Sequence, residues 1–176
     1  DSSRYILYKN SSLMFESLSM DGSECGGMKV TLIQGKLRGT SGKCGHGKTE
    51  IKTTAASAFA WGTDYEIRFI TESEATPEFP AGFYQKVNEG KVKVVNPLGS
   101  VLIHPGEAGF VSSMEHEPII IDIPDFFTNQ FGSAKKDTTQ TTTENQQQRT
   151  PSKEAIKPNK YKKRYIESGS SKIFKV

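Results

Sequence analysis

The sequence predicts an all-β domain followed by a basic tail, and three observations lead to this prediction. Short segments such as Met28–Leu32 and Asp64–Ile70 alternate apolar and polar residues, with the period of two that a half-buried strand requires. Turn residues such as those of Asn96–Gly99 separate these segments. No long segment of the sequence has a convincing helical period. Many short strands at close spacing are typical of a short-stranded sandwich, a roll or a short β-solenoid.

The chain divides into a β body at residues 1–125 and a tail at residues 126–176. The apolar runs and alternating segments of the body predict nine strands. These are Arg4–Lys9, Leu13–Met20, Met28–Leu32, Lys48–Thr53, Asp64–Ile70, Lys91–Val95, Val101–Ile103, Gly109–Val111 and Pro118–Ile123. A short echo, Gln34–Arg38 and Glu89–Lys93, repeats the form polar-Gly-Lys-apolar-basic. It indicates either an internal repeat or two similar hairpins.

The tail has the composition of a segment that does not fold alone. From Ser133 onward it carries 11 Lys and Arg against 4 Asp and Glu, and its first part contains runs of Thr and Gln. Such a segment buries too little surface to offset the entropy of ordering. We therefore expect an extended or disordered tail. Apolar and aromatic residues return at its end, so the tail is either a solvated appendage or an arm that docks on a partner. The candidate partner contacts are Tyr161, Lys162, Lys163, Arg164, Tyr165, Ile173 and Phe174.

Two cysteines, Cys25 and Cys44, lie in glycine-rich polar stretches. Unpaired cysteines are more often buried among apolar neighbours. The pair therefore favours a disulfide and an oxidising compartment, with two free thiols as the alternative. His46 adds too few ligands at an unfamiliar spacing for a metal site. We expect no metal and no cofactor.

Two sets of motifs in the body resemble the FecR-domain family. The first is Val30–Arg38, which contains Gly35-Lys36, followed by Ile51–Thr53 and Trp61–Ile67. The second is Val87–Val94, followed by Gly99–Glu107. Together the motifs lie within residues 13–112, and their order is more specific than any one of them. The residues that carry the resemblance are Gly35, Lys36, Gly62, Thr63, Asp64, Gly90, Lys91, Pro105, Gly106 and Glu107.

The resemblance implies a FecR-like β fold, a place in the bacterial envelope and a protein-binding role. Regulators of this family span the membrane and work with a sigma factor and an outer-membrane transporter. Here the likeness extends to no membrane helix, and a low-complexity tail stands where the family has a further domain. The motif residues look structural, and the alternation places Lys36, Arg38, Lys91 and Lys93 on the solvent face. Trp61 stands where the family often has arginine, so it either packs in the core or contacts a partner.

No catalytic constellation is present in the sequence, which lacks a Gly-x-Ser-x-Gly elbow, a phosphate loop and a His-Glu-x-x-His motif. Glu115-His116-Glu117 is best interpreted as a solvated turn. We expect no enzyme. The leading hypothesis is a periplasmic or otherwise exported interaction and scaffold module, a subunit of a larger assembly with the tail as its docking arm.

One alternative is a peptidoglycan- or carbohydrate-binding domain in which Trp61, Tyr65, Phe83 and Tyr84 stack on sugar rings. A further alternative is a periplasmic sensor. The expected partners are other envelope proteins. Basic residues beside tyrosines in the tail could bind nucleic acid, but export would separate the chain from it, so we do not expect that partner.

Overall fold

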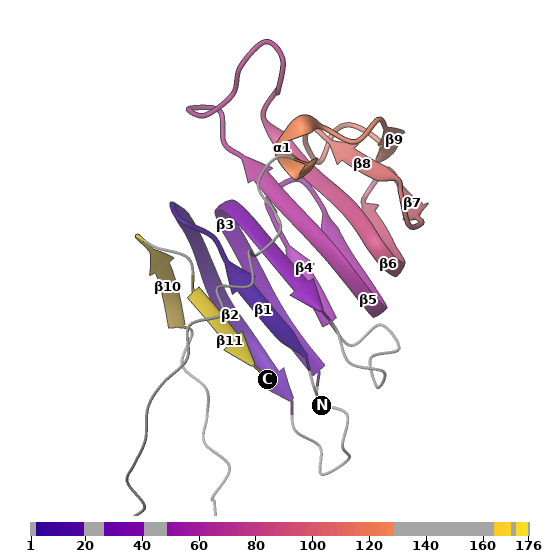
Figure 1. Cartoon of the computed structure of the whole chain (residues 1–176). Coiled ribbons are helices and arrows are strands. Elements are labelled where there is room, and N and C mark those ends of the chain that lie inside the picture. The colour runs from indigo at the N-terminus through magenta and orange to yellow at the C-terminus, as the bar shows by residue number, and fades with distance from the viewer. Residues whose placement is uncertain (1–2, 20–26, 41–48, 129–163, 170–171, 176) are drawn as a thin grey trace, which may run out of the picture.

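The computed structural model describes residues 3–19, 27–40, 49–128, 164–169 and 172–175 and confirms the all-β prediction. Eleven strands form one mixed, open sheet, and one short helix is the only helix of the described residues (Figure 1). The elements are β1 (Arg4–Leu7), β2 (Ser11–Ser19), β3 (Gly27–Thr40), β4 (Thr49–Lys52), β5 (Ser57–Ile70), β6 (Gly82–Asn96), β7 (Gly99–Ile103), β8 (Ala108–Val111), β9 (Ile119–Ile121), α1 (Asp125–Thr128), β10 (Arg164–Ser168) and β11 (Lys172–Lys175).

Three long strands, β3, β5 and β6, form the middle of the sheet, where the sequence predicts shorter segments. The strand order is β10-β2-β3-β4-β5-β6-β8-β9. β1 and β2 lie end to end along β3, and β7 and β8 lie end to end along β6. β10 and β11 continue the sheet beyond β2 and β1. All pairings are antiparallel except the one between β3 and β4.

The parallel pairing of β3 with β4 requires β3 to bend. Met28 of β3 pairs with Thr49 of β4, so the chain must return from Thr40 to the beginning of β3. A straight strand from Met28 to Thr40 would span about 40 Å. The nine peptide steps from Thr40 to Thr49 reach only about 32 Å. β3 is therefore curved, and it pairs with β2 before the bend and with β1 and β5 after it.

The glycines of the two echoing Gly-Lys segments both have a positive φ. Gly35 in β3 has φ +88° and Gly90 in β6 has φ +80°, a left-handed region that favours glycine. Each glycine lies where its long strand changes partner, from β2 to β1 along β3 and from β8 to β7 along β6. The echo therefore marks two places where a glycine with positive φ accompanies a change of partner strand.

The curved sheet encloses one large apolar core and one smaller cluster. The large core takes residues from β1 to β8, with Tyr5, Leu32 and Ile67 fully buried. The smaller cluster joins Ile70 and Tyr84 to the two phenylalanines of α1, Phe126 and Phe127. Burying a phenylalanine side chain contributes about 1.5–3 kcal/mol. The packed structure therefore continues past residue 125, the predicted end of the body, through α1.

Candidate functional site at the open edge of the sheet

β9 is a short edge strand made of three isoleucines. It pairs with β8, and no described strand pairs with its other side. Ile119 and Ile120 are 51% and 46% exposed. An edge strand presents unpaired N–H and C=O groups, and charged residues usually protect it from pairing with another chain. β9 itself contains no charged residue, although Pro118 and Asp122 flank it.

Beside β9 lies an apolar groove of about 400 Å³. Its walls are apolar and aromatic side chains from four stretches of the body. They are Phe79, Pro80, Tyr84, Phe110, Ile121, Ile123 and Pro124. Three carboxylates, those of Glu78, Asp122 and Asp125, complete the lining. The groove therefore combines an apolar floor with a negatively charged rim.

Aromatic contacts hold the floor of the groove in place. The ring of Tyr84 lies 4.6 Å from the ring of Phe110 and 5.2 Å from that of Phe126, between centroids. Phe79 meets Phe126 edge to face at 5.0 Å. The Tyr84 hydroxyl donates a hydrogen bond to the Pro80 carbonyl at 2.8 Å, and burial raises the pKa of Tyr84. The groove is pre-formed, which lowers the entropy cost of binding.

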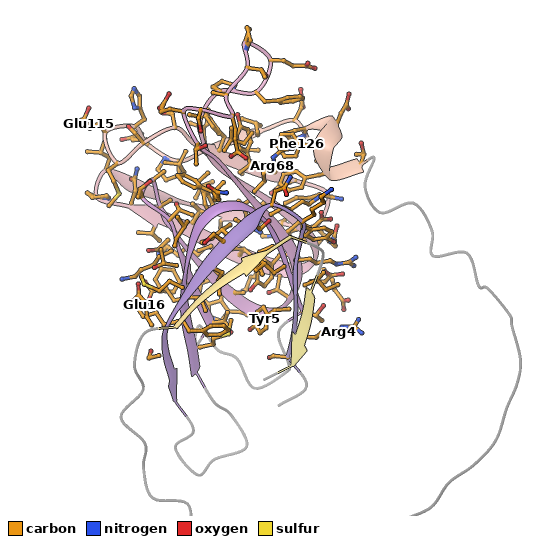
Figure 2. All side chains as sticks on the ribbon, turned by 90° about the vertical axis from the view of Figure 1, so that its left-hand side faces the viewer. Arg4, Tyr5, Glu16, Arg68, Glu115 and Phe126 are labelled. Atoms are coloured by element: carbon orange, nitrogen blue, oxygen red, sulfur yellow. The ribbon has the colours of Figure 1, made fainter. Side chains whose placement is uncertain are left out.

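Behind the groove lies a buried ion cluster that joins three strands and the helix. The Lys36 ammonium in β3 is 3.0 Å from the Glu66 carboxylate in β5 and donates to the Phe126 carbonyl at 3.1 Å. Lys86 in β6 is 3.6 Å from Glu66. Burial lowers the pKa of Lys36, an effect that Glu66 opposes. Arg68 lies beside Phe126 (Figure 2). Its guanidinium is 4.6 Å from the centroid of the Phe126 ring.

The prediction that Lys36 lies on the solvent face is wrong. Its side chain is only 6% exposed, because the bend at Gly35 and the cover of α1 bring it between Glu66 and the Phe127 ring. Lys91 and Lys93 are exposed as predicted. Arg38 is half-buried and forms two hydrogen bonds to Asp64, at 2.9 and 2.6 Å. Asp64 raises the pKa of Arg38.

The other residues of the FecR-like motifs shape turns and bends. Thr63 accepts a hydrogen bond from the Trp61 amide at 2.9 Å and donates one to the Lys91 carbonyl at 3.0 Å. Gly62, with φ +54°, and Gly90 face each other across this irregularity. In the Pro105-Gly106 turn, Glu107 accepts from the His104 amide at 2.8 Å, and Gly106 has φ +83°. These contacts stabilise the backbone.

The sugar-stacking surface proposed for the carbohydrate alternative is wrong. Tyr65 and Phe83 are fully buried in the large core, and Tyr84 is 3% exposed within the smaller cluster. Trp61 is half-buried, and its neighbour across the sheet is Lys91. These four rings form no shared surface on which a sugar could stack.

Several predicted residues lie elsewhere. Cys25, Cys44, Tyr161, Lys162 and Lys163 are outside the described residues. Arg164 and Tyr165 belong to β10, and Ile173 and Phe174 to β11. The end of the tail thus adds to the chain's own sheet.

The described ranges contain no cluster of three or more His, Cys, Asp or Glu residues arranged to hold a metal ion. His104 and His116 belong to separate turns, and Glu115, His116 and Glu117 are all exposed, as expected of a solvated turn. Within these ranges no helix is long and apolar enough to cross a membrane.

The groove is not apparent from the sequence. Its lining comes from segments between Glu78 and Asp125 that meet only in the folded sheet. One signal was present in the run Ile119-Ile120-Ile121. An isoleucine at every position departs from the alternation of a strand with one solvent face, and so points to an additional apolar contact.

Comparisons with known proteins are limited to structural likeness. No protein-family model matches the chain, and no curated protein matches it. Two crystal structures of a candidate anti-sigma factor from Parabacteroides distasonis are similar over 68% of this chain, with TM-scores of 0.49 and 0.48 and identities of 18% and 17%. The chain spans 51% of the length of each of those structures.

Proposed function

We propose that the protein is a non-catalytic interaction module that binds an extended segment of a partner protein as an additional strand beside β9. The observation that carries this proposal is the pair of exposed isoleucines, Ile119 and Ile120, on an edge strand without charges. The pairing of β10 and β11 with β2 and β1 supports it, because the opposite edge of the same sheet already receives remote strands.

The groove defines the chemistry of the partner. Its aromatic floor takes apolar side chains, which alternate with outward-facing ones along an extended segment. The carboxylates of Glu78, Asp122 and Asp125 favour lysine or arginine in that segment. The partner segment therefore alternates apolar and basic residues.

Peptide binding to the β9 edge tests this proposal. The probe is a seven-residue peptide in which lysine alternates with valine and isoleucine. The double variant Ile119→Lys and Ile120→Lys should weaken binding at least about tenfold, a loss of about 1.4 kcal/mol, because it places like charge on the edge. Fluorescence anisotropy gives the affinity, and hydrogen exchange should show new protection of the β9 amides.

A matched control variant is available elsewhere in the body. Leu98→Lys together with Met114→Lys makes the same two charge changes at residues of similar exposure, 51% and 47%, away from the groove lining. It should bind the peptide nearly like the wild type. Equal loss in both variants, or equal binding of a peptide with glutamate in place of lysine, would contradict the proposed site.

We also propose that the module works in the bacterial envelope within a larger assembly. The FecR-like motifs and the two cysteines support this location. The cysteines of the natively isolated protein should form a disulfide between Cys25 and Cys44. Intact mass spectrometry should then show a gain of about 2 Da on reduction. Alkylation of both thiols without reductant would count against an oxidising compartment.

A further inference from the structure

The end of the tail behaves as one edge strand with a single interruption. β10 pairs with β2 from Arg164 opposite Phe15 to Ser168 opposite Ser11. β11 pairs with β1 from Lys172 opposite Leu7 to Lys175 opposite Arg4. β10 therefore extends the sheet beside β2, and β11 extends it beside β1. We call β10 and β11 together the arm and the outer side of β1 and β2 the acceptor edge.

The arm is attached to the body through main-chain pairing. Its strands pair with β1 and β2 and not with each other, and Figure 1 shows them side by side with these strands at one edge of the sheet. Main-chain pairing satisfies the N–H and C=O groups of the acceptor edge. The same bonds form when an arm of identical sequence comes from another molecule.

The chain is long enough for the arm to reach another molecule. Residues 129–163 separate Thr128, at the end of α1, from Arg164, at the start of β10. The 36 peptide steps between these two residues reach up to about 120 Å. A folded body of this size has a radius of gyration of roughly 14 Å. The acceptor edge of a second copy is therefore within reach.

We propose that the arm is exchangeable, so that two copies of the chain dimerise by adding their arms to each other's acceptor edge. The exchanged dimer and the closed monomer contain the same strand pairs, and their balance depends on concentration. A tethered arm competes at an effective concentration of up to about 1 mM. Dilution therefore favours the monomer, while crowding or a shorter connection favours the dimer.

The first experiment frees the acceptor edge in the full-length chain. The substitutions are Tyr165→Pro, Ile166→Pro, Ile173→Pro and Phe174→Pro. Proline lacks an N–H donor, and along a strand the N–H groups of alternate residues point toward the same neighbouring strand. Two consecutive prolines therefore remove, from each arm strand, one N–H group that points toward the acceptor edge. A labelled peptide of residues 161–176 should bind this variant at least tenfold more tightly than the wild type, whose own arm competes.

The second experiment shortens the connection in the otherwise unchanged chain. Deleting residues 131–160 leaves five residues between Thr128 and Arg164, which limits the span to about 20 Å. Analytical ultracentrifugation should show a larger dimer fraction at equal concentration. The same deletion in the four-proline variant should leave it monomeric.

These outcomes separate exchange from other arrangements. A peptide that binds neither protein, with the four-proline variant retaining its β-sheet circular dichroism, would overturn the proposal. A shortened chain that stays monomeric would also overturn it, because the arm would then serve only its own body. If the four-proline variant loses its fold, the proposal is tested by the dimer fraction of the shortened chain alone. All of these readouts concern the acceptor edge and are independent of peptide binding at β9.

Discussion

Replacing Glu66 with alanine is expected to lower the free energy of unfolding by about 3–5 kcal/mol. The Glu66 carboxylate is 2% exposed and pairs with Lys36, which is 6% exposed. Removing the carboxylate leaves the Lys36 ammonium buried without its counter-charge. Urea denaturation followed by circular dichroism measures the change. The loss should appear as a lower midpoint with an unchanged slope.

Two further variants test whether the loss of stability comes from breaking the Lys36–Glu66 ion pair or from removing any carboxylate. Glu89→Ala removes a carboxylate from an exposed position of β6 and should change stability by less than about 0.5 kcal/mol. The double variant Lys36→Met and Glu66→Leu removes the buried pair and fills the space with apolar groups, while Lys86, whose side chain is 17% exposed, loses the Glu66 carboxylate. It should recover most of the stability that Glu66→Ala loses, since apolar replacement of a buried pair is often neutral. A Glu66→Ala protein as stable as the wild type would contradict this account.

Replacing Gly90 with alanine is expected to cost about 3 kcal/mol, because two effects coincide. At φ +80° a side chain strains the backbone. A Cβ at this position would also lie 2.6 Å from the Gly62 carbonyl oxygen, and the Gly62 backbone is itself constrained by φ +54°. Thermal and urea unfolding should both show the loss.

Gly99→Ala is the matched control for this substitution. A Cβ at Gly99 meets no atom within 4 Å, and its φ lies outside the left-handed region. Alanine there should change stability by no more than about 0.5 kcal/mol. Similar effects of the two substitutions would show that Gly90 is not constrained by its conformation.

Local patterns in the sequence predict the strands and turns well. The alternation of Asp64–Ile70 and the turn at Pro105-Gly106 depend on neighbouring residues only, and both are present in the structure. The long strands were harder to predict, because an internal glycine resembles a turn. Gly35 and Gly90 bend β3 and β6 without ending them.

Features that depend on distant segments could not be derived from such patterns. The burial of Lys36 requires Phe126, which lies 90 residues further along the chain. The groove beside β9 requires Phe79, Phe110 and Ile123 to meet. The return of apolar residues at the end of the tail was visible in the sequence. The sequence did not show that β11 pairs with β1, because β1 lies at the other end of the chain.

The pairing of Arg4 with Lys175 also determines how the protein responds to mechanical load. β1 begins and β11 ends at the same end of an antiparallel pair, so a force that pulls these two ends apart acts across the strands. Such a force breaks the hydrogen bonds between β1 and β11 one after another. A force along the strands would instead load all of these bonds at once. The arm should therefore detach at low force while β3, β5 and β6 stay folded.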